Sequence, residues 1–223
     1  MPRRPVPRLI VRIIDEHRRR ATRLGDALDP RLFDAYPAGS GEHADRVLNG
    51  TDLILVYDAP GAIDTLDRAM LKALNFVPFC AYGKPHDPWK VVSALRRGAI
   101  DYFLFPTDVT LNERALLAYS EGKKRSSRRL QFEKARIAIG NLSTRQYEIV
   151  VLAADGLTPR MIGRQLGLAQ RTVEVHLNAA MQTLRLETQQ QLPELKFALQ
   201  HSHVEGATSK FKNPPLNYYE PGG

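Results

Sequence analysis

The sequence predicts a two-part chain: an α/β domain with a doubly wound, parallel five-stranded sheet, followed by an all-α helix-turn-helix domain. In the first 120 residues, short apolar runs alternate with helix-like amphipathic segments, which is typical of parallel strands joined by helices. After Gly140 no strand signal reappears. A glycine turn between two short helical segments there predicts the helix-turn-helix.

The elements of the first part follow from their apolar patterns. Apolar runs predict strands at 9–14, 52–57, 76–81 and 102–105, and a weaker one at 32–36 because Pro37 and two glycines follow at once. Helical spacing of apolar residues predicts helices over 66–74, 88–97 and 112–139. The number of strands suits a three-layer domain of about 120 residues.

Three helices are predicted in the second part. The first begins at Ser143 and ends at Asp155-Gly156. The second begins at Thr158, a good N-cap with Pro159 at the first helical position, and ends at Gly167. The third covers 170–186 after only a few residues, so the last two form the helix-turn-helix.

The third helix has two distinct faces at about 100° per residue. Val173, Leu177, Ala180 and Leu184 share one sector and predict a core stripe. The other side mixes hydrogen-bonding groups with the apolar Val175, which suits direct readout of base edges in a major groove. The alternative is an ordinary amphipathic surface helix.

The charge of the chain is unevenly distributed. The net charge is +8, and residues 121–223 carry 15 Lys/Arg against 9 Asp/Glu, or +6, whereas residues 1–120 carry 17 against 15, or +2. A local basic excess favours binding to a phosphate backbone, so double-stranded DNA is the first partner to consider.

Several classes of protein are excluded. One cysteine, Cys80, can form neither an internal disulfide nor a thiolate zinc site, and it favours a reducing compartment. The longest apolar run, 53–57, is far short of the about 20 residues of a spanning helix. No nucleophilic triad, phosphate-binding glycine loop or metal-ligand spacing occurs. We therefore expect a cytoplasmic protein without membrane, cofactor, metal or enzymatic activity.

The domain boundaries are expected as follows. The α/β domain covers 1–120, a basic helical linker 121–140, and the helix-turn-helix domain 141–203. Residues 204–223, which are poor in apolar side chains, are expected to form a flexible tail.

Residues 142–186 resemble the LuxR-type (NarL/FixJ) DNA-binding domain. The motif Leu-Ser-Thr-Arg-Gln-x-Glu-Ile-Val at 142–150, the Ile-Gly pair at 162–163 and Thr-Val-x-Val-His-Leu at 172–177 carry the resemblance. One departure is Glu174, where the family usually has Lys, so the operator sequence is expected to differ. The DNA-binding candidates are Thr158, Arg160, Arg164, Arg171, Thr172, Glu174, Val175, His176, Asn178 and Gln182.

The first part resembles the receiver domain of two-component response regulators, which implies flavodoxin-like strand order. The acidic pair Asp15-Glu16 after the first strand, the segment 52–60 and the segment 98–106 carry this resemblance. It implies that the acidic pair binds Mg²⁺ and that an aspartate after the third strand accepts a phosphoryl group.

The phosphorylation site is expected to be degenerate. Phe105 replaces the family's lysine, and the position of the family's switch Ser/Thr falls near Gly83, which has no hydroxyl. The spacing puts Tyr57 rather than Asp58 in the acceptor position. These changes remove charge neutralisation and the hydroxyl that reports phosphorylation. We therefore interpret the domain as a pseudo-receiver. Asp15, Glu16 and Asp58 could still form a weak Mg²⁺ site, or be strand-end carboxylates facing water.

The sequence thus predicts a homodimeric, sequence-specific transcription regulator whose receiver-like domain works without aspartyl phosphorylation. The family's usual dimer surface would lie at about 88–118. One alternative is a conventional response regulator phosphorylated on Asp58. Another is an adaptor that binds RNA polymerase or a protein regulator, because LuxR-type folds resemble a promoter-reading segment of sigma factors.

Overall fold

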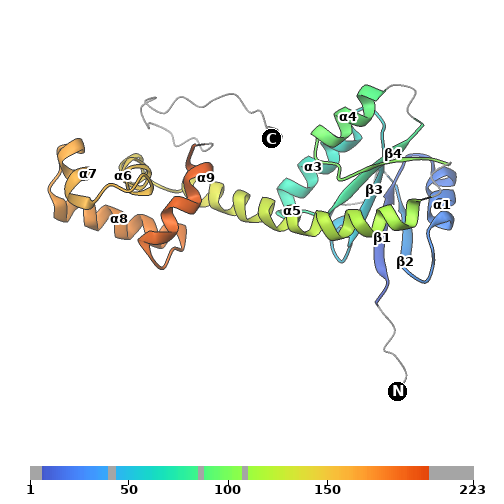
Figure 1. Ribbon diagram of the computed structural model, residues 1–223, viewed down its shortest axis with the longest axis horizontal. Coiled ribbons are helices and arrows are strands. Elements are labelled where there is room, and N and C mark those ends of the chain that lie inside the picture. The colour runs from blue at the N-terminus through green and yellow to red at the C-terminus, as the bar shows by residue number, and fades with distance from the viewer. Residues whose placement is uncertain (1–6, 40–43, 85–87, 107–109, 201–223) are drawn as a thin grey trace, which may run out of the picture. The chain divides into compact units, whose positions relative to one another are not determined.

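The computed structural model describes residues 7–39, 44–84, 88–106 and 110–200 (Figure 1). The chain divides into two compact units, with the boundary between Leu130 and Gln131. The tail expected at 204–223 lies outside the described residues. Across the described ranges, no helix is both long enough and apolar enough to cross a membrane.

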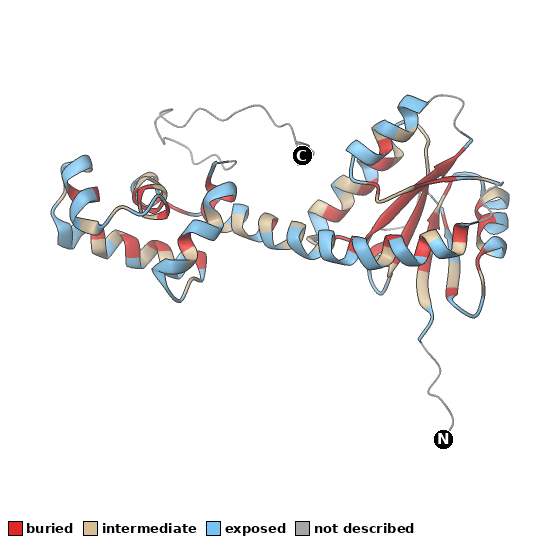
Figure 2. Ribbon diagram, viewed as in Figure 1, coloured by how far each residue is buried: buried red, intermediate tan, exposed pale blue. Residues whose placement is uncertain are grey.

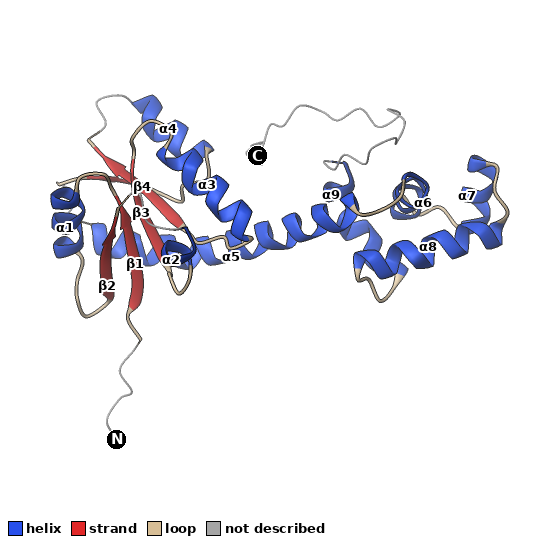
Figure 3. Ribbon diagram, turned by 180° about the vertical axis from the view of Figure 1, so that it is seen from behind, coloured by secondary structure: helices blue, strands red, loops and turns tan. Residues whose placement is uncertain are grey.

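The first unit contains a five-stranded, all-parallel sheet in the order β2-β1-β3-β4-β5 (Figures 1 and 3). This order confirms the predicted doubly wound, flavodoxin-like class. The strands are β1 (Leu9–Ile14), β2 (Phe33–Ala38), β3 (Leu53–Tyr57), β4 (Phe79–Gly83) and β5 (Tyr102–Leu104).

Alternation along the strands produces two hydrophobic cores, one on each face of the sheet. Leu53 and Leu55 of β3 pack with helix α1 (Arg18–Ala27) and the first turns of α5 (Leu111–Gly140). Ile54 and Val56 pack with the helices of the opposite face, which are α2 (Ala44–Leu48), α3 (Ala62–Ala73) and α4 (Pro88–Arg96). The central strands are buried on both sides, as Figure 2 shows.

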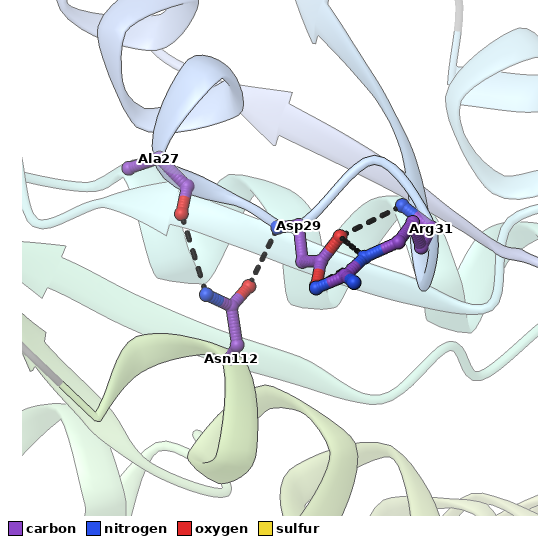
Figure 4. A network of polar contacts seen from close by, with 4 residues as sticks. All are labelled: Ala27, Asp29, Arg31 and Asn112. Carbon is purple, nitrogen blue, oxygen red and sulfur yellow. Dashed lines mark hydrogen bonds and ion pairs between the residues drawn. The ribbon is translucent and has the colours of Figure 1, made fainter.

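Asn112 fixes the start of α5 to the loop between α1 and β2 (Figure 4). Its side-chain amide donates to the Ala27 carbonyl at 3.4 Å, and its oxygen accepts from the Asp29 backbone N–H at 2.8 Å. The Asp29 carboxylate in turn accepts from the backbone and guanidinium of Arg31. These bonds satisfy the backbone of a loop and set where α5 begins.

The second unit is helical, as expected, and has its own core. It contains α6 (Thr144–Ala154), α7 (Pro159–Leu166), α8 (Gln170–Leu184), a 3₁₀ segment η1 (Gln189–Leu195) and α9 (Lys196–Gln200). Ile149, Ile162, Val173 and Leu177 are fully or almost fully buried at its centre. Ile139, near the end of α5, belongs to the same core.

The segment expected as a linker, 121–140, lies wholly within α5 and is packed at both ends. In the first unit, Arg129 forms an ion pair with Asp67 at 2.6 Å, and Leu130 packs against the apolar core. In the second unit, Phe132 and Ile139 pack against the helical core. The division of the chain therefore falls inside this helix.

Some predicted boundaries were wrong. Strand β4 begins at Phe79 rather than at residue 76, because the residues before Pro78 are buried without joining the sheet. The third helix of the second unit ends at Leu184, two residues early, where Arg185 takes a left-handed conformation with φ 55°. Helices α1 and α2 were not predicted.

Candidate nucleic-acid interface and receiver cleft

The turn between α7 and α8 is built from the residues that the sequence singled out. The Thr158 hydroxyl accepts from the backbone N–H of Met161 and caps α7, whereas Gly167 ends it with φ 68°. Gly163 allows the turn to close tightly, because a Cβ there would lie 2.6 Å from the Leu168 carbonyl oxygen. The two helices are therefore held in one fixed arrangement.

Helix α8 presents a continuous outward stripe. Val173, Leu177, Ala180 and Leu184 are buried, in agreement with the predicted core stripe. On the outer side Arg171, Val175, Asn178 and Gln182 are exposed at spacings of four, three and four residues. Val175 is 55% exposed, so this face of α8 offers one apolar side chain among its polar groups.

The remaining DNA-binding candidates divide by exposure. Thr158, Arg160, Arg164 and Thr172 are exposed, and His176 is half-buried. Glu174 is also half-buried and has partners on its own helix: it accepts from the Gln170 side chain at 2.8 Å and lies 3.6 Å from the Arg171 guanidinium. A negative charge therefore sits beside the exposed stripe.

The end of β1 carries a buried carboxylate in a dense polar network. Asp15 is 4% exposed. The Arg20 guanidinium forms a two-point ion pair with both Asp15 oxygens, each at 2.6 Å, and the Tyr82 hydroxyl donates to Oδ2. Burial raises the pKa of Asp15, but these bonds and one from the His17 backbone N–H outweigh it, so the pKa lies below the ordinary 3.8.

The two residues that compete for the acceptor position lie in different surroundings. The Tyr57 ring lies under the Arg20 guanidinium, 3.4 Å from its central carbon, and packs edge-on against Tyr82. The Asp58 carboxylate instead accepts from the Tyr102 hydroxyl at 3.2 Å. The side chain that packs against the Asp15 network is therefore Tyr57, whereas Asp58 is bonded to Tyr102.

Tyr102 also explains why position 83 lacks a side chain. A Cβ on Gly83 would lie 2.7 Å from the Tyr102 hydroxyl oxygen, well inside contact distance. Phe105, at the position of the family's lysine, is half-buried and packs edge-on against Tyr82 at 6.2 Å. Aromatic rings and a tyrosine hydroxyl thus fill the positions that the resemblance assigns to a lysine and a switch hydroxyl.

These contacts do not fit the weak magnesium site considered for Asp15, Glu16 and Asp58. Magnesium needs several oxygens in near-octahedral geometry, whereas both Asp15 oxygens already accept hydrogen bonds from Arg20. Glu16 is exposed. Within the described ranges, no three His, Cys, Asp or Glu side chains are grouped so that they could hold a metal ion.

The chain is similar to a known family and to several known proteins. The family model of the luxR family of bacterial regulatory proteins matches residues 140–195, which include α6, α7, α8 and η1. This part of the chain belongs to the luxR family. The family consists of DNA-binding transcription regulators rather than enzymes. This confirms the expectation of a DNA-binding transcription regulator and the expectation that the protein is not an enzyme.

Similarity extends beyond the luxR-family domain. The nitrate/nitrite response regulator NarL of Escherichia coli K12 is 26% identical over 195 residues, covering 79% of this chain and 89% of NarL. Nodulation protein W of Bradyrhizobium diazoefficiens is 26% identical over 135 residues, covering 60% of each chain. Full-length FixJ from B. japonicum is 17% identical with a TM-score of 0.44, covering 89% of this chain and 100% of FixJ. The luxR-family match and the similarity to NarL confirm the resemblance to NarL/FixJ-type regulators.

The receiver cleft is the site at the strand ends formed around Asp15, Tyr57, Asp58, Gly83 and Phe105. Three further residues of this cleft were not anticipated from the sequence. Arg20 comes from α1, which has few apolar residues and was not predicted. Tyr102 was predicted only as a strand residue, and Tyr82 lay just beyond the predicted strand at 76–81. A signal did exist, because a buried tyrosine hydroxyl needs a hydrogen-bond partner, and two tyrosines at neighbouring strand ends indicate a polar site.

Proposed function

We propose that this protein is a homodimeric, sequence-specific transcription regulator that reads operators with α8, and whose receiver-like domain works without aspartyl phosphorylation. The observation that carries the DNA-reading part is the exposed stripe of Arg171, Val175, Asn178 and Gln182 on a helix that is otherwise fixed in a core. Amide side chains pair with adenine, and an aliphatic group meets a thymine methyl. We also propose that the protein is located in the cytoplasm, where bacterial DNA lies.

The proposed independence from phosphorylation rests on the cleft. Arg20 holds Asp15 in an ion pair, Tyr102 occupies the space beside Gly83, and Phe105 offers no cation. A phosphoryl group on Asp58 would lack the family's lysine, which Phe105 replaces, and the switch hydroxyl, for which Gly83 has no side chain, so the usual groups that neutralise and report its charge are missing.

The proposed dimer surface is apolar and lies on α4, β5 and the first turns of α5. Among the described residues, the exposed large apolar side chains there include Val92, Leu95, Leu104 and Leu117, the last 62% exposed. A second copy of this chain is the occupant we propose, because a cluster of such side chains indicates an interaction surface and a two-fold contact buries the same patch on both copies.

The experiment uses the full chain and a pool of genomic fragments. We expect recovery of one consensus sequence and an affinity that falls steeply between about 50 and 200 mM salt, as phosphate contacts require. Sedimentation of the wild type and of Leu117→Glu tests the dimer, with the exposed Gln190→Glu as control. Absence of DNA binding at low salt, with binding to RNA polymerase instead, would favour the adaptor alternative.

A further inference from the structure

A cavity of about 340 Å³ lies at the edge of the sheet where the strands end, next to α1. Arg19, Arg20, Arg23 and Lys84 line it with four positive charges, and Tyr57 and Phe105 line it with two aromatic rings. No carboxylate of the described residues lines it, although the acidic pair Asp15-Glu16 lies nearby in the sequence. The cavity is therefore cationic and aromatic.

Three of the four cations have no acidic partner in the described part of the chain. Arg20 is bound to Asp15, but Arg19, Arg23 and Lys84 form no ion pair there. Arg19 and Arg23 are four residues apart on α1, so they share one face and repel each other. An anion between them would replace this repulsion with attraction.

The aromatic rings already contact guanidinium groups. Arg20 stacks on Tyr57 at 3.4 Å, and the Arg23 guanidinium carbon lies 6.0 Å from the centre of the Phe105 ring. Planar guanidinium and aromatic groups stack with planar rings, and a guanidinium also binds a carboxylate or phosphate with two parallel hydrogen bonds. One site thus offers both kinds of contact.

We propose that this cavity binds a small aromatic anion, a planar ring that carries a carboxylate or a phosphate. Its anionic group is bound by Arg23 and Lys84, and its ring packs against Tyr57 and Phe105. The volume lies within the range of about 300–1,000 Å³ of small-molecule pockets. The strand order also favours this edge, because ligands of open α/β sheets bind outside the carboxyl ends of the strands. The proposal does not depend on DNA binding.

The test titrates the full chain with benzoate, phenyl phosphate, the neutral benzamide and inorganic phosphate, followed by calorimetry and by amide chemical shifts. We expect one of the two aromatic anions to bind with one-to-one stoichiometry and to identify the preferred anionic group. Benzamide and inorganic phosphate should each bind at least tenfold more weakly. Shifts should concentrate on α1 and the residues after β4.

Variants separate the site from general basic charge. The double variant Arg23→Gln, Lys84→Gln should weaken binding at least tenfold, whereas Arg18→Gln, an exposed arginine on α1 outside the cavity, should change it less than twofold. Lys84 lies outside any helix or strand, so the single variant Lys84→Gln disturbs the fold little. If the double variant folds poorly, Lys84→Gln is compared with Arg18→Gln instead. Equal weakening by Arg18→Gln, equal binding of benzamide, or no binding of either aromatic anion would overturn the proposal.

Discussion

The Arg20 side chain closes a two-point ion pair over the buried carboxylate of Asp15 at 2.6 Å. Removing the guanidinium leaves Asp15 buried without its cation, which is costly because a buried charge loses its compensation. We expect Arg20→Met to lower the free energy of unfolding by about 3 kcal/mol in urea denaturation. The exposed Arg18→Met is the control, and a loss for Arg20→Met no larger than the control's would show that the pair does not stabilise the fold.

The same pair sets a pH dependence. The pKa of Asp15 in the folded chain lies below the unfolded value of 3.8, so its stabilisation is complete above that value and is lost as the pH falls through the lowered pKa. The difference in stability between wild type and Asp15→Asn, which has no titrating group at this position, should be constant from about pH 8 to 5 and should shrink below about pH 4. A difference that shrinks near neutral pH would point to another titrating group.

Gly83 and Tyr102 should be energetically coupled. An alanine Cβ at position 83 would meet the Tyr102 hydroxyl at 2.7 Å, so Gly83→Ala should cost about 1–3 kcal/mol through overpacking. Tyr102→Phe removes that hydroxyl, and the double variant should recover most of the loss. A double-mutant cycle of unfolding free energies measures the coupling, and simple additivity would contradict this explanation of the missing side chain.

Phosphorylation should be dispensable. Asp58→Asn and Asp58→Ala should leave DNA affinity and oligomeric state as in wild type, and acetyl phosphate with Mg²⁺ should add no stable phosphate by intact mass. Phe105→Lys alone should not restore the chemistry, because Tyr102 still fills the space beside Gly83. A phosphate-dependent rise in DNA binding that Asp58→Asn abolishes would support the conventional regulator.

Much of the fold was predictable because its signals are local. Strand β1 was predicted with its observed bounds, since its apolar run is bounded by polar residues, and α7 was predicted because Thr158 and Gly167 mark its two ends. Helix α1 was missed for the opposite reason. It buries only Ala21 and Leu24 among arginines and has no side-chain N-cap, so its apolar periodicity is too weak to recognise.

Only the missing groups of the receiver cleft were predictable from the sequence. Comparison with the family pattern showed that Phe105 and Gly83 supply neither the lysine nor the switch hydroxyl, but it did not show which side chains replace them. The replacing groups, Arg20, Tyr82 and Tyr102, come from three elements, and only the parallel sheet brings them together. A sequence pattern records spacing along the chain and not the convergence of strand ends.

Val175 and Asn178 should determine sequence preference. Each lies on the exposed stripe of α8, so replacement by Ala should relax the preference at one base pair by about 1–3 kcal/mol. Arg171→Ala should weaken binding to all sequences alike if the guanidinium contacts phosphate. Binding-site selection on each variant measures this, with Thr183→Ala, on α8 but off the stripe, as control. An unchanged consensus for both stripe variants would place them outside the groove.

Glu174 should oppose DNA binding. Its carboxylate lies 3.6 Å from the Arg171 guanidinium and adds a negative charge beside the stripe. This charge repels DNA phosphates, and the ion pair competes with DNA for the Arg171 guanidinium. Glu174→Gln should raise affinity for all duplexes about fivefold, or ~1 kcal/mol, and should steepen the salt dependence by about one phosphate contact. The exposed Glu187→Gln, beyond the end of α8, removes the same charge away from the stripe and should have a smaller effect. If Glu174 instead accepts a hydrogen bond from cytosine, Glu174→Gln will lower affinity only for operators with that base, and fluorescence anisotropy with matched cytosine and thymine operators distinguishes the two outcomes.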